Sequence, residues 1–357
     1  MKTLFDEIEI AGMKLKNRFV RSATYDGCAD GNGHPTPRLY KIYEDLARGG
    51  VGTIITGLTS VSDAEQLMGR QMAIHDDSFI PEYRIMTDTA HRHGAAIILQ
   101  LACMGTQHHA HAGVKSAWGP SVVEDLAYKI TAQEMSRADI DRIREDFARG
   151  ALRAKRAGFD GVQLHAAHGY LLSKFLTPYY NRRSDEYGGS IENRGRLLFE
   201  TCQAIREKVG PDYPVLIKIN CEDFMEQGMT FEECRFVCAR LAELGIDAIE
   251  VSGGSFSSRP NESPARKEEG YFRRYAEQLA RELPIPVIVV GGNRDFETMS
   301  ELVRESSIMA VSLSRPLIRE SALIERWRGG DRSRALCISC NKCFNPKGTS
   351  CVFNQGV

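Results

Sequence analysis

Eight short apolar segments, separated by stretches with helical spacing, constrain the fold of this 357-residue chain more than any other feature. Near-continuous Val and Ile runs that alternate with amphipathic helices are typical of a parallel sheet covered by helices. Eight repeated units favour a closed (β/α)8 TIM barrel over an open doubly wound sheet, and no glycine-rich dinucleotide fingerprint follows the first segment. The predicted strands are Arg18–Ala23, Gly52–Thr56, Ala95–Leu101, Gly161–Leu164, Pro214–Ile219, Ala248–Val251, Pro286–Val290 and Met309–Leu313.

The joints between the predicted units repeat as well. Segments 46–55, 154–163 and 241–250 share a plan of helix, terminating glycine, short turn and strand. Glycine fits the left-handed position that ends such helices. One helix is expected over Ser190–Val209, with Ser190 as its N-cap and Glu192 in its first turn.

The ends of the chain differ from the repeats. Phe5–Ile10 and Met13–Lys16 predict a β-hairpin that closes the N-terminal end of the barrel. No linker or composition break occurs before about Arg328, so we expect a barrel domain over residues 1–328 and a short cysteine-rich tail over 329–357. Two connections, Ala102–Met135 and His165–Gly189, are long enough to be functional loops.

Charge balance limits the partners that the chain can have. Lys and Arg number 46 against 47 Asp and Glu, a net charge of −1, which gives no basic field for nucleic acid or an anionic membrane. The N-terminus has acids where a signal sequence needs an apolar run, and runs such as Ile285–Val290 are too short to span a bilayer. We therefore expect a cytoplasmic protein with a small-molecule substrate.

The ten cysteines fall into two groups. Four crowd into one short segment, which in a chain without a secretion signal suggests metal or redox chemistry more than disulfides. These are Cys337, Cys340, Cys343 and Cys351. The other six are scattered and are expected to be buried small hydrophobic residues, at positions 28, 103, 202, 221, 234 and 238.

Residues 165–170, with the sequence HAAHGY, directly follow the predicted fourth strand. His165, His168 and Tyr170 therefore leave a strand end together, where parallel α/β folds build their catalytic sites. Metal binding is the alternative for two histidines three residues apart, but no H-E-x-x-H pattern or nearby carboxylate completes such a site.

This block, together with four shorter motifs, resembles the Old Yellow Enzyme family of FMN-dependent oxidoreductases, in particular the barrel of the 2,4-dienoyl-CoA reductase and trimethylamine dehydrogenase branch. The shorter motifs are Leu15–Arg18, Leu99–Leu101, Leu216–Ile219 and Ser314–Pro316. The resemblance spans about Leu4 to about Trp327. It implies FMN across the C-terminal mouth of the barrel and NADH or NADPH as the hydride donor.

The resemblance also implies roles for single residues. His165 and His168 would donate hydrogen bonds to the carbonyl oxygen of an enone or a similar acceptor, and Tyr170 would protonate the α-carbon. Lys218 would lie beside flavin N1 and O2, with an ion pair to Glu222 or Asp223 as the structural alternative. Gln100 would bind the pyrimidine edge of the flavin.

The paired glycines after the seventh strand and Ser314-Arg315 after the eighth correspond to a phosphate site, although paired glycines also suit a simple tight turn. The complete predicted cofactor-binding set is Ser22, Ala23, Thr24, Gly57, Gln100, Lys218, Gly254, Gly291, Gly292, Ser314 and Arg315.

Several positions depart from the family pattern. Tyr25 stands where a Thr or Cys commonly contacts the flavin, and Cys103–Thr106 replaces a His-Ala-Gly-Arg sequence. His108, His109 and His111 form a second imidazole cluster, interpreted as part of a solvated or substrate-facing loop, with metal binding as the alternative.

The tail resembles the [4Fe–4S] ligand run of the dienoyl-CoA reductase branch, with a shorter last gap. Four thiolates also suit tetrahedral zinc, and free thiols remain open.

The leading hypothesis is an ene-reductase that passes hydride from NADH or NADPH through FMN to an electron-poor alkene or a related acceptor. The alternatives are an oxidative flavoenzyme that delivers electrons through a tail cluster to a partner protein, a non-catalytic zinc-bearing scaffold subunit, and a flavin-free metal-dependent lyase on the same fold. A homo-oligomer is a weaker expectation.

Overall fold

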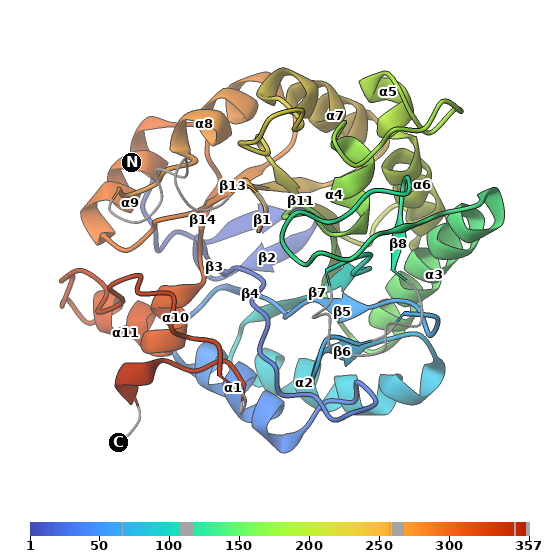
Figure 1. The fold of residues 1–357 in the computed structure, drawn as a ribbon. Coiled ribbons are helices and arrows are strands. Elements are labelled where there is room, and N and C mark those ends of the chain that lie inside the picture. Colours follow the sequence, from blue (N-terminus) through green and yellow to red (C-terminus); the bar gives the residue numbers. More distant parts are fainter. Residues whose placement is uncertain (66, 108–116, 257, 259–267, 346–347, 355–357) are drawn as a thin grey trace.

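The computed structural model describes residues 1–357 except 66, 108–116, 257, 259–267, 346–347 and 355–357. Eight parallel strands form a ring with helices around it (Figure 1). The ring closes because β7 pairs with β4 on one side and with β10 on the other. The barrel strands are β3 (Phe19–Arg21), β4 (Thr53–Ile55), β7 (Ala96–Ala102), β10 (Gly161–Ala166), β11 (Val215–Asn220), β12 (Ala248–Ser252), β13 (Val287–Val290) and β14 (Ala310–Leu313). The predicted (β/α)8 barrel is confirmed.

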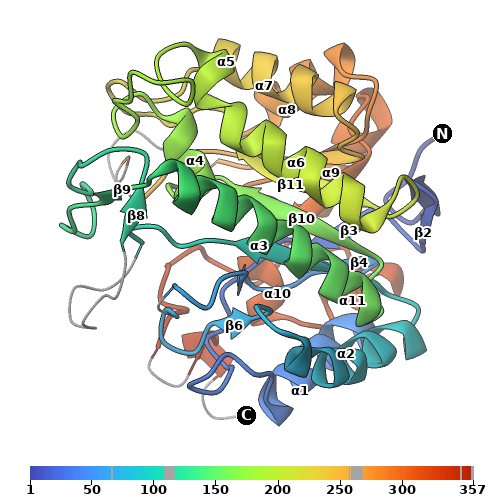
Figure 2. The same ribbon diagram turned by 90° about the vertical axis from the view of Figure 1, so that its right-hand side faces the viewer.

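The long helices form the outer layer because they bury an apolar stripe on one face. On α3, for example, Ile140, Ile143, Phe147 and Ala151 are buried at helical spacing, and α3 lies beside α6 (Figure 2). The helices are α1 (Pro37–Arg48), α2 (Ile80–Arg92), α3 (Arg137–Arg156), α4 (Leu171–Leu176), α5 (Ile191–Arg194), α6 (Arg196–Val209), α7 (Phe231–Glu243), α8 (Arg273–Glu282), α9 (Phe296–Glu305), α10 (Arg315–Arg319) and α11 (Leu323–Arg328).

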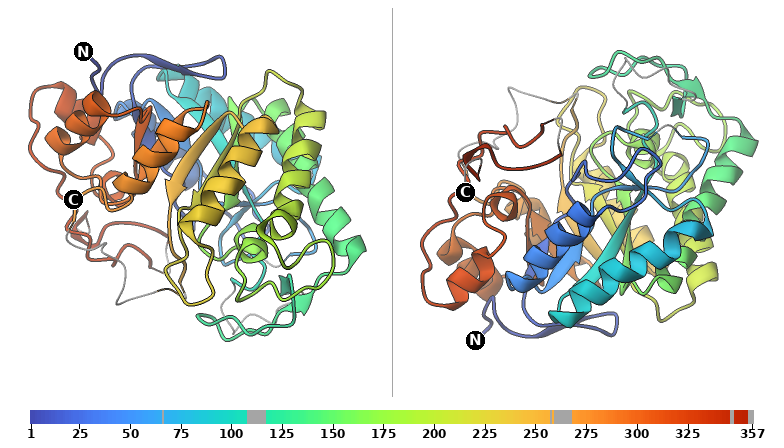
Figure 3. Two further views of the ribbon diagram at one scale, coloured as in Figure 1. Left: turned by 90° about the horizontal axis from the view of Figure 1, so that it is seen from above. Right: turned by 90° about the horizontal axis from the view of Figure 1, so that it is seen from below.

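A β-hairpin closes the N-terminal end of the barrel, as predicted. Its strands β1 (Ile8–Ile10) and β2 (Met13–Leu15) pair antiparallel, and both turn residues adopt positive φ, 50° at Ala11 and 80° at Gly12. The hairpin packs its apolar side chains on the inward residues of the strands, among them Leu216. Figure 3 shows the hairpin in blue at the end of the barrel opposite the long loops. The long loops therefore lie at the C-terminal end of the barrel strands.

The predicted helix over Ser190–Val209 is two helices, α5 and α6. They meet at Gly195, where a Cβ would lie 2.6 Å from the ring of Phe199. Ser190 is the N-cap of α5 and Glu192 lies in its first turn, although the Ser190 side chain makes no capping hydrogen bond.

The predicted boundaries of the two long loops were wrong. Strand β10 continues through Ala166, so His165 lies within the strand, and α4 occupies part of the segment that follows. The other loop begins inside β7 and contains the short strand pair β8 (Trp118–Gly119) and β9 (Gln133–Glu134). Two further strands, β5 (Thr59–Ser60) and β6 (Met72–Ala73), extend the sheet beside β7 and were not predicted.

The C-terminal segment returns to the mouth of the barrel. The guanidinium of Arg294 donates to Ser339 Oγ (2.8 Å), and Thr349 N donates to Asp26 O (2.7 Å). The division into a barrel over 1–328 and a tail over 329–357 stays a prediction. Among the described residues, no helix is long and apolar enough to cross a membrane. All ten cysteines are free, and the six scattered ones are buried as expected.

Candidate functional site

A cavity of about 470 Å³ opens at the carboxyl ends of the barrel strands. It is lined by all three predicted catalytic residues and by every predicted cofactor-binding residue except Gly57. Gly57 lies behind the cavity wall, because a Cβ there would be 2.7 Å from Thr24 O, and its amide donates to Tyr43 Oη (2.9 Å). The predicted residues thus come together at one mouth.

The strand register explains why the inner residues converge. Cα pairing aligns His165 with Lys218 and Lys218 with Glu250, so three neighbouring strands point these side chains into the barrel at one level. Gln100 and Gln163 are paired in the same way on β7 and β10. These aligned polar side chains form a layer, called the polar layer below, on the mouth side of the apolar residues that pack with the hairpin. Its members are Gln100, Gln163, His165, Lys218 and Glu250.

The histidine pair and the tyrosine form one cluster. The His165 ring centroid lies 5.3 Å from that of His168 and 4.4 Å from that of Tyr170. His168 adopts a left-handed backbone with φ 63°, fixed by its N–H to Asn220 Oδ1 (3.2 Å) and by its Nε2 against Ser252 Oγ (2.7 Å). A non-glycine residue held in this region by several contacts is a common feature of functional sites.

His165 is a neutral imidazole. It is 3% exposed, and burial, followed by the neighbouring His168 and Lys218 charges, holds its pKa well below the ordinary value. Its Nδ1 has no hydrogen-bond partner among the described residues. A buried ring nitrogen without a partner is expensive unless a ligand completes it.

Tyr170 is a protonated phenol. Burial raises its pKa well above the ordinary value, with smaller contributions from Tyr128, Tyr25 and Glu65. Its ring packs with Leu58 and other apolar side chains beside the cavity. The hydroxyl therefore retains its proton through neutral pH.

Lys218 forms its ion pair with Glu250, at 3.2 Å between Nζ and Oε2. The alternative prediction, an ion pair between Lys218 and Glu222 or Asp223, was wrong. Tyr275 Oη donates to Glu222 (3.1 Å), and Asp223 is buried elsewhere, where it accepts from Asn220 Nδ2 (2.8 Å). The sequence could not reveal the pairing because Lys218 and Glu250 meet only through the register of β11 and β12.

Gln100 extends this polar layer. Its Nε2 donates to Gln163 Oε1 (2.8 Å), and Gln163 Nε2 in turn donates to Glu250 Oε2 (2.8 Å). Gln100 and Lys218 line the cavity, whereas Gln163 and Glu250 do not. The chain thus presents an amide and an ammonium in the cavity wall and supports both from below.

The predicted phosphate region is a glycine turn beside a guanidinium. Gly291 and Gly292 have φ 113° and 75°, and a Cβ on either would lie within 3.0 Å of the Tyr271 ring. Arg315 lines the same part of the cavity and donates to Asn341 Oδ1 of the tail. The amide of Gly254 donates to Glu222 O (2.9 Å), so this N–H is already used.

Tyr25 connects the mouth to the tail. Its hydroxyl donates to Met68 O (3.0 Å), and its ring stacks on Phe344 with centroids 6.3 Å apart. Cys103 O accepts from Leu171 N (3.1 Å), which fixes the Cys103–Thr106 segment against α4. His108, His109 and His111 lie outside the described residues.

The other three tail thiols lie close enough to Cys343 to affect it. Burial raises the pKa of Cys343, and the thiols of Cys337, Cys351 and Cys340 raise it further. Cys343 also lines the cavity. Within the described ranges, no group of three or more His, Cys, Asp or Glu side chains is arranged to hold a metal ion. The predicted metal site stays a prediction.

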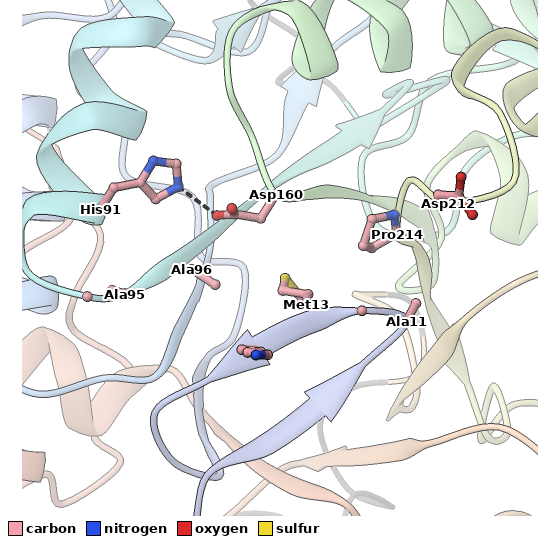
Figure 4. A pocket seen from close by; sticks show the side chains of 11 residues that line it. Ala11, Met13, His91, Ala95, Ala96, Asp160, Asp212 and Pro214 are labelled. Atoms are coloured by element: carbon pink, nitrogen blue, oxygen red, sulfur yellow. Dashed lines mark hydrogen bonds and ion pairs between the residues drawn. The ribbon is translucent and has the colours of Figure 1, made fainter.

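A second cavity, of about 530 Å³, lies at the opposite end of the barrel beside the hairpin (Figure 4). His91 Nε2 and Asp160 Oδ2 are 2.8 Å apart there. None of the predicted site residues lines this cavity.

Sequence reasoning missed Glu250, Asn220 and Ser252, which position Lys218 and His168. A signal existed for the first of them, because Glu250 is an acid inside the apolar strand segment Ala248–Val251 and a buried carboxylate requires partners. Asn220 and Ser252 carry no such signal.

Comparison with known proteins agrees with this geometry. Residues 3–332 match the NADH:flavin oxidoreductase / NADH oxidase family. An NADH oxidase from Thermoanaerobacter brockii is 33% identical over 344 residues, which cover 95% of this chain and 52% of that protein. An NADPH dehydrogenase from Geobacillus thermodenitrificans is 36% identical over 324 residues, 88% of this chain and 91% of that protein.

Among solved structures, 2-naphthoyl-CoA reductase in complex with 2-naphthoyl-CoA aligns with a TM-score of 0.90 at 26% identity. The alignment covers 96% of this chain and 54% of that one. The chain thus spans about half the length of this reductase and of the NADH oxidase. The predicted fold, the enzyme class and the use of FMN with NAD(P)H are confirmed at the level of the family. The chain belongs to the NADH:flavin oxidoreductase / NADH oxidase family, the Old Yellow Enzyme family that its motifs resemble.

Proposed function

We propose that the mouth of this barrel binds FMN and passes hydride from NADH or NADPH to an electron-poor alkene or a related acceptor. One observation carries the proposal: His165, His168 and Tyr170 face the same cavity whose wall presents Lys218 and Gln100. Hydrogen-bond donors for an acceptor oxygen and polar groups for a flavin ring are thus offered from neighbouring strands.

The residues present fit FMN. Lys218 and Gln100 would face the polar edge of the ring, and Arg315 with the Gly291-Gly292 turn would hold the phosphate. The unpartnered Nδ1 of His165 supports a site that a ligand completes. When bound, FMN supplies a carrier that accepts and donates hydride.

The chain's own residues would bind and polarise the acceptor. The imidazoles of His165 and His168 would donate hydrogen bonds to its carbonyl oxygen, where negative charge develops. A donor of this kind is worth about 3–4 kcal/mol in other enzymes. Ser252 and Asn220 hold His168 in place for this contact. Tyr170, whose pKa is raised by burial, keeps its proton available for the α-carbon.

Anaerobic spectroscopy of the full chain reconstituted with FMN tests this proposal. We expect NADH or NADPH to bleach the flavin spectrum and 2-cyclohexenone to restore it. His165→Ala with His168→Ala should lower kcat/KM for the enone by about 10²–10³-fold while flavin binding persists. His91→Gln, in the cavity at the far end of the barrel, is the control and should keep wild-type activity. Full activity in the double variant, or no FMN binding by the wild type, would refute the proposal.

A second candidate is the oxidative flavoenzyme. It is favoured by Cys343, which lines the cavity and lies near the three other tail thiols. In this version a substrate reduces the flavin, and electrons leave through a cluster on Cys337, Cys340, Cys343 and Cys351 to a partner protein. Iron and zinc analysis of anaerobically purified protein separates the candidates, since only the oxidative version requires iron.

The remaining expectations go with the proposal. The substrate, the choice between NADH and NADPH, a homo-oligomeric state and a cytoplasmic location stay predictions. So does the absence of nucleic-acid and membrane partners, for which the net charge of −1 is the supporting observation.

A further inference from the structure

Glu250 is the most deeply buried charged side chain of the polar layer. It is 0% exposed and points into the barrel from β12. Its Oε1 accepts from the hydroxyls of Ser22 and Ser312, each at 2.7 Å. Its Oε2 accepts from Gln163 (2.8 Å) and faces Lys218 Nζ (3.2 Å). Four donors therefore converge on one carboxylate, from β10, β11, β14 and the residue that follows β3, and they compensate its charge.

The ammonium of Lys218 is held from the same side. Nζ donates to Ser22 Oγ at 2.6 Å, and that hydroxyl donates to Glu250. Lys218, Ser22 and Ser312 line the cavity, whereas Glu250 does not. The positive end of the pair therefore faces a ligand in the mouth, and the negative end lies outside the cavity lining.

The pair changes the electrostatics of the mouth. Burial alone lowers the pKa of Lys218, and the adjacent Glu250 raises it again. Arg21 on β3 is the other buried cation that acts on Lys218, and it has its own counter-ion in Asp26 at 3.5 Å. A ligand above Lys218 thus experiences an ammonium whose charge is largely offset. An isolated cation there would bind an anionic ligand more strongly.

We propose that Glu250 is a positioning residue that holds the Lys218 ammonium at the cavity wall and offsets its charge, so that it sets the preference of the mouth for an anionic over a neutral ring. The part that concerns the flavin rests on the proposed function, because reduced FMN is the anionic ring and oxidised FMN the neutral one. The part that concerns Lys218 rests only on the geometry of the chain.

The midpoint potential of bound FMN tests the charge offset. Glu250→Gln leaves the cation uncompensated and should shift the ratio of the dissociation constants for oxidised and reduced FMN about tenfold toward the reduced form, or about 30 mV for the two-electron couple. Glu250→Asp keeps the charge, so its midpoint potential should remain close to that of the wild type.

The lysine variants complete the test. Lys218→Met should lower the midpoint potential, and Lys218→Met with Glu250→Gln should return it to near the wild-type value. The double variant removes both charges, so it also serves if Glu250→Gln does not fold.

The lysine itself provides a readout that needs no flavin. In the full chain without FMN, side-chain NMR of labelled lysine should show the pKa of Lys218 falling by about one unit or more in Glu250→Gln and little change in Glu250→Asp. An unchanged lysine titration, an unchanged potential in Glu250→Gln, or a double variant that follows Lys218→Met would overturn the inference. A wild type that binds no FMN would instead sink the proposed function, and the lysine titration would then decide the inference alone.

Discussion

Glu65 is a buried carboxyl group next to the residues that support Tyr170. Its Oε1 accepts from Met104 N, and Met104 packs with Tyr170. Its Oε2 accepts from Ser60 Oγ at 2.7 Å. Burial raises the pKa of Glu65 from 4.5 to about 7, although the hydroxyl and amide donors oppose the shift. The folded chain therefore binds this proton more tightly than the unfolded chain does.

Stability should accordingly depend on pH through Glu65. The contribution is most favourable below the unfolded pKa of about 4.5 and is lost as the pH rises to about 7. A shift of this size corresponds to roughly 3 kcal/mol. Glu65→Gln removes the titration and keeps an acceptor for Met104. Its unfolding free energy should therefore gain about 2.5 kcal/mol on wild type between pH 5 and pH 8, since part of the contribution is already lost at pH 5. Urea denaturation at both pH values measures this gain, with Glu301→Gln on the exposed face of α9 as the control. Parallel pH profiles for wild type and Glu65→Gln would contradict the prediction.

At this scale the sequence predicted those residues whose signal is local. His165, His168 and Tyr170 lie within six residues, and Lys218 interrupts an apolar strand segment, so a motif contains them. Glu250 was not predicted, because its partners come from other strands and only the barrel register brings them together.

For secondary-structure elements too, the sequence predicted what a local pattern encodes and missed what depends on three-dimensional contacts. The barrel strands were predicted because each is an apolar run, whereas β5 and β6 have two residues each and no periodicity to detect. The break between α5 and α6 was missed because Leu197 and Leu198 continue the apolar stripe of the predicted helix. The Phe199 ring that contacts Gly195 is visible only in three dimensions.

Two serine caps provide a matched prediction at the level of the helix. Ser136 begins α3 with a capping box: its side chain accepts from Asp139 N (3.2 Å), and Asp139 accepts from Ser136 N (2.8 Å). Ser190 begins α5 without a capping hydrogen bond from its side chain. Ser136→Ala should therefore lower the free energy of unfolding by about 1 kcal/mol, whereas Ser190→Ala should change it little. Denaturant midpoints with unchanged m-values measure both, and equal losses would contradict the role of the capping box.

At the scale of the whole molecule, the tail is packed as a wall of the mouth. Thr349 N donates to Asp26 O (2.7 Å), and Gly348 lies against Cys28 with φ 105°. A Cβ on Gly348 would be 2.4 Å from Cys28 Sγ. Cys28 is 2% exposed, so the tail helps to shield this thiol from solvent. The sequence predicted a cysteine-rich tail but no contact with the loop after β3, because nothing in the tail specifies where it folds back.

Gly348→Ala should therefore detach this part of the tail. Its matched control is Gly330→Ala, which has nearly the same backbone conformation, φ 101°, but no described atom within 4 Å of the added Cβ. Both substitutions carry a similar cost for a left-handed alanine, so their difference isolates the packing on Cys28.

The rate of Cys28 alkylation measures this difference. We expect Gly348→Ala to accelerate it by about tenfold or more and Gly330→Ala to leave it close to the wild-type rate, because exposure of a buried thiol follows local opening. Peptide-resolved mass spectrometry after timed iodoacetamide treatment distinguishes Cys28 from the other cysteines. Equal rates in the two variants would mean that the tail does not shield the loop after β3 in solution.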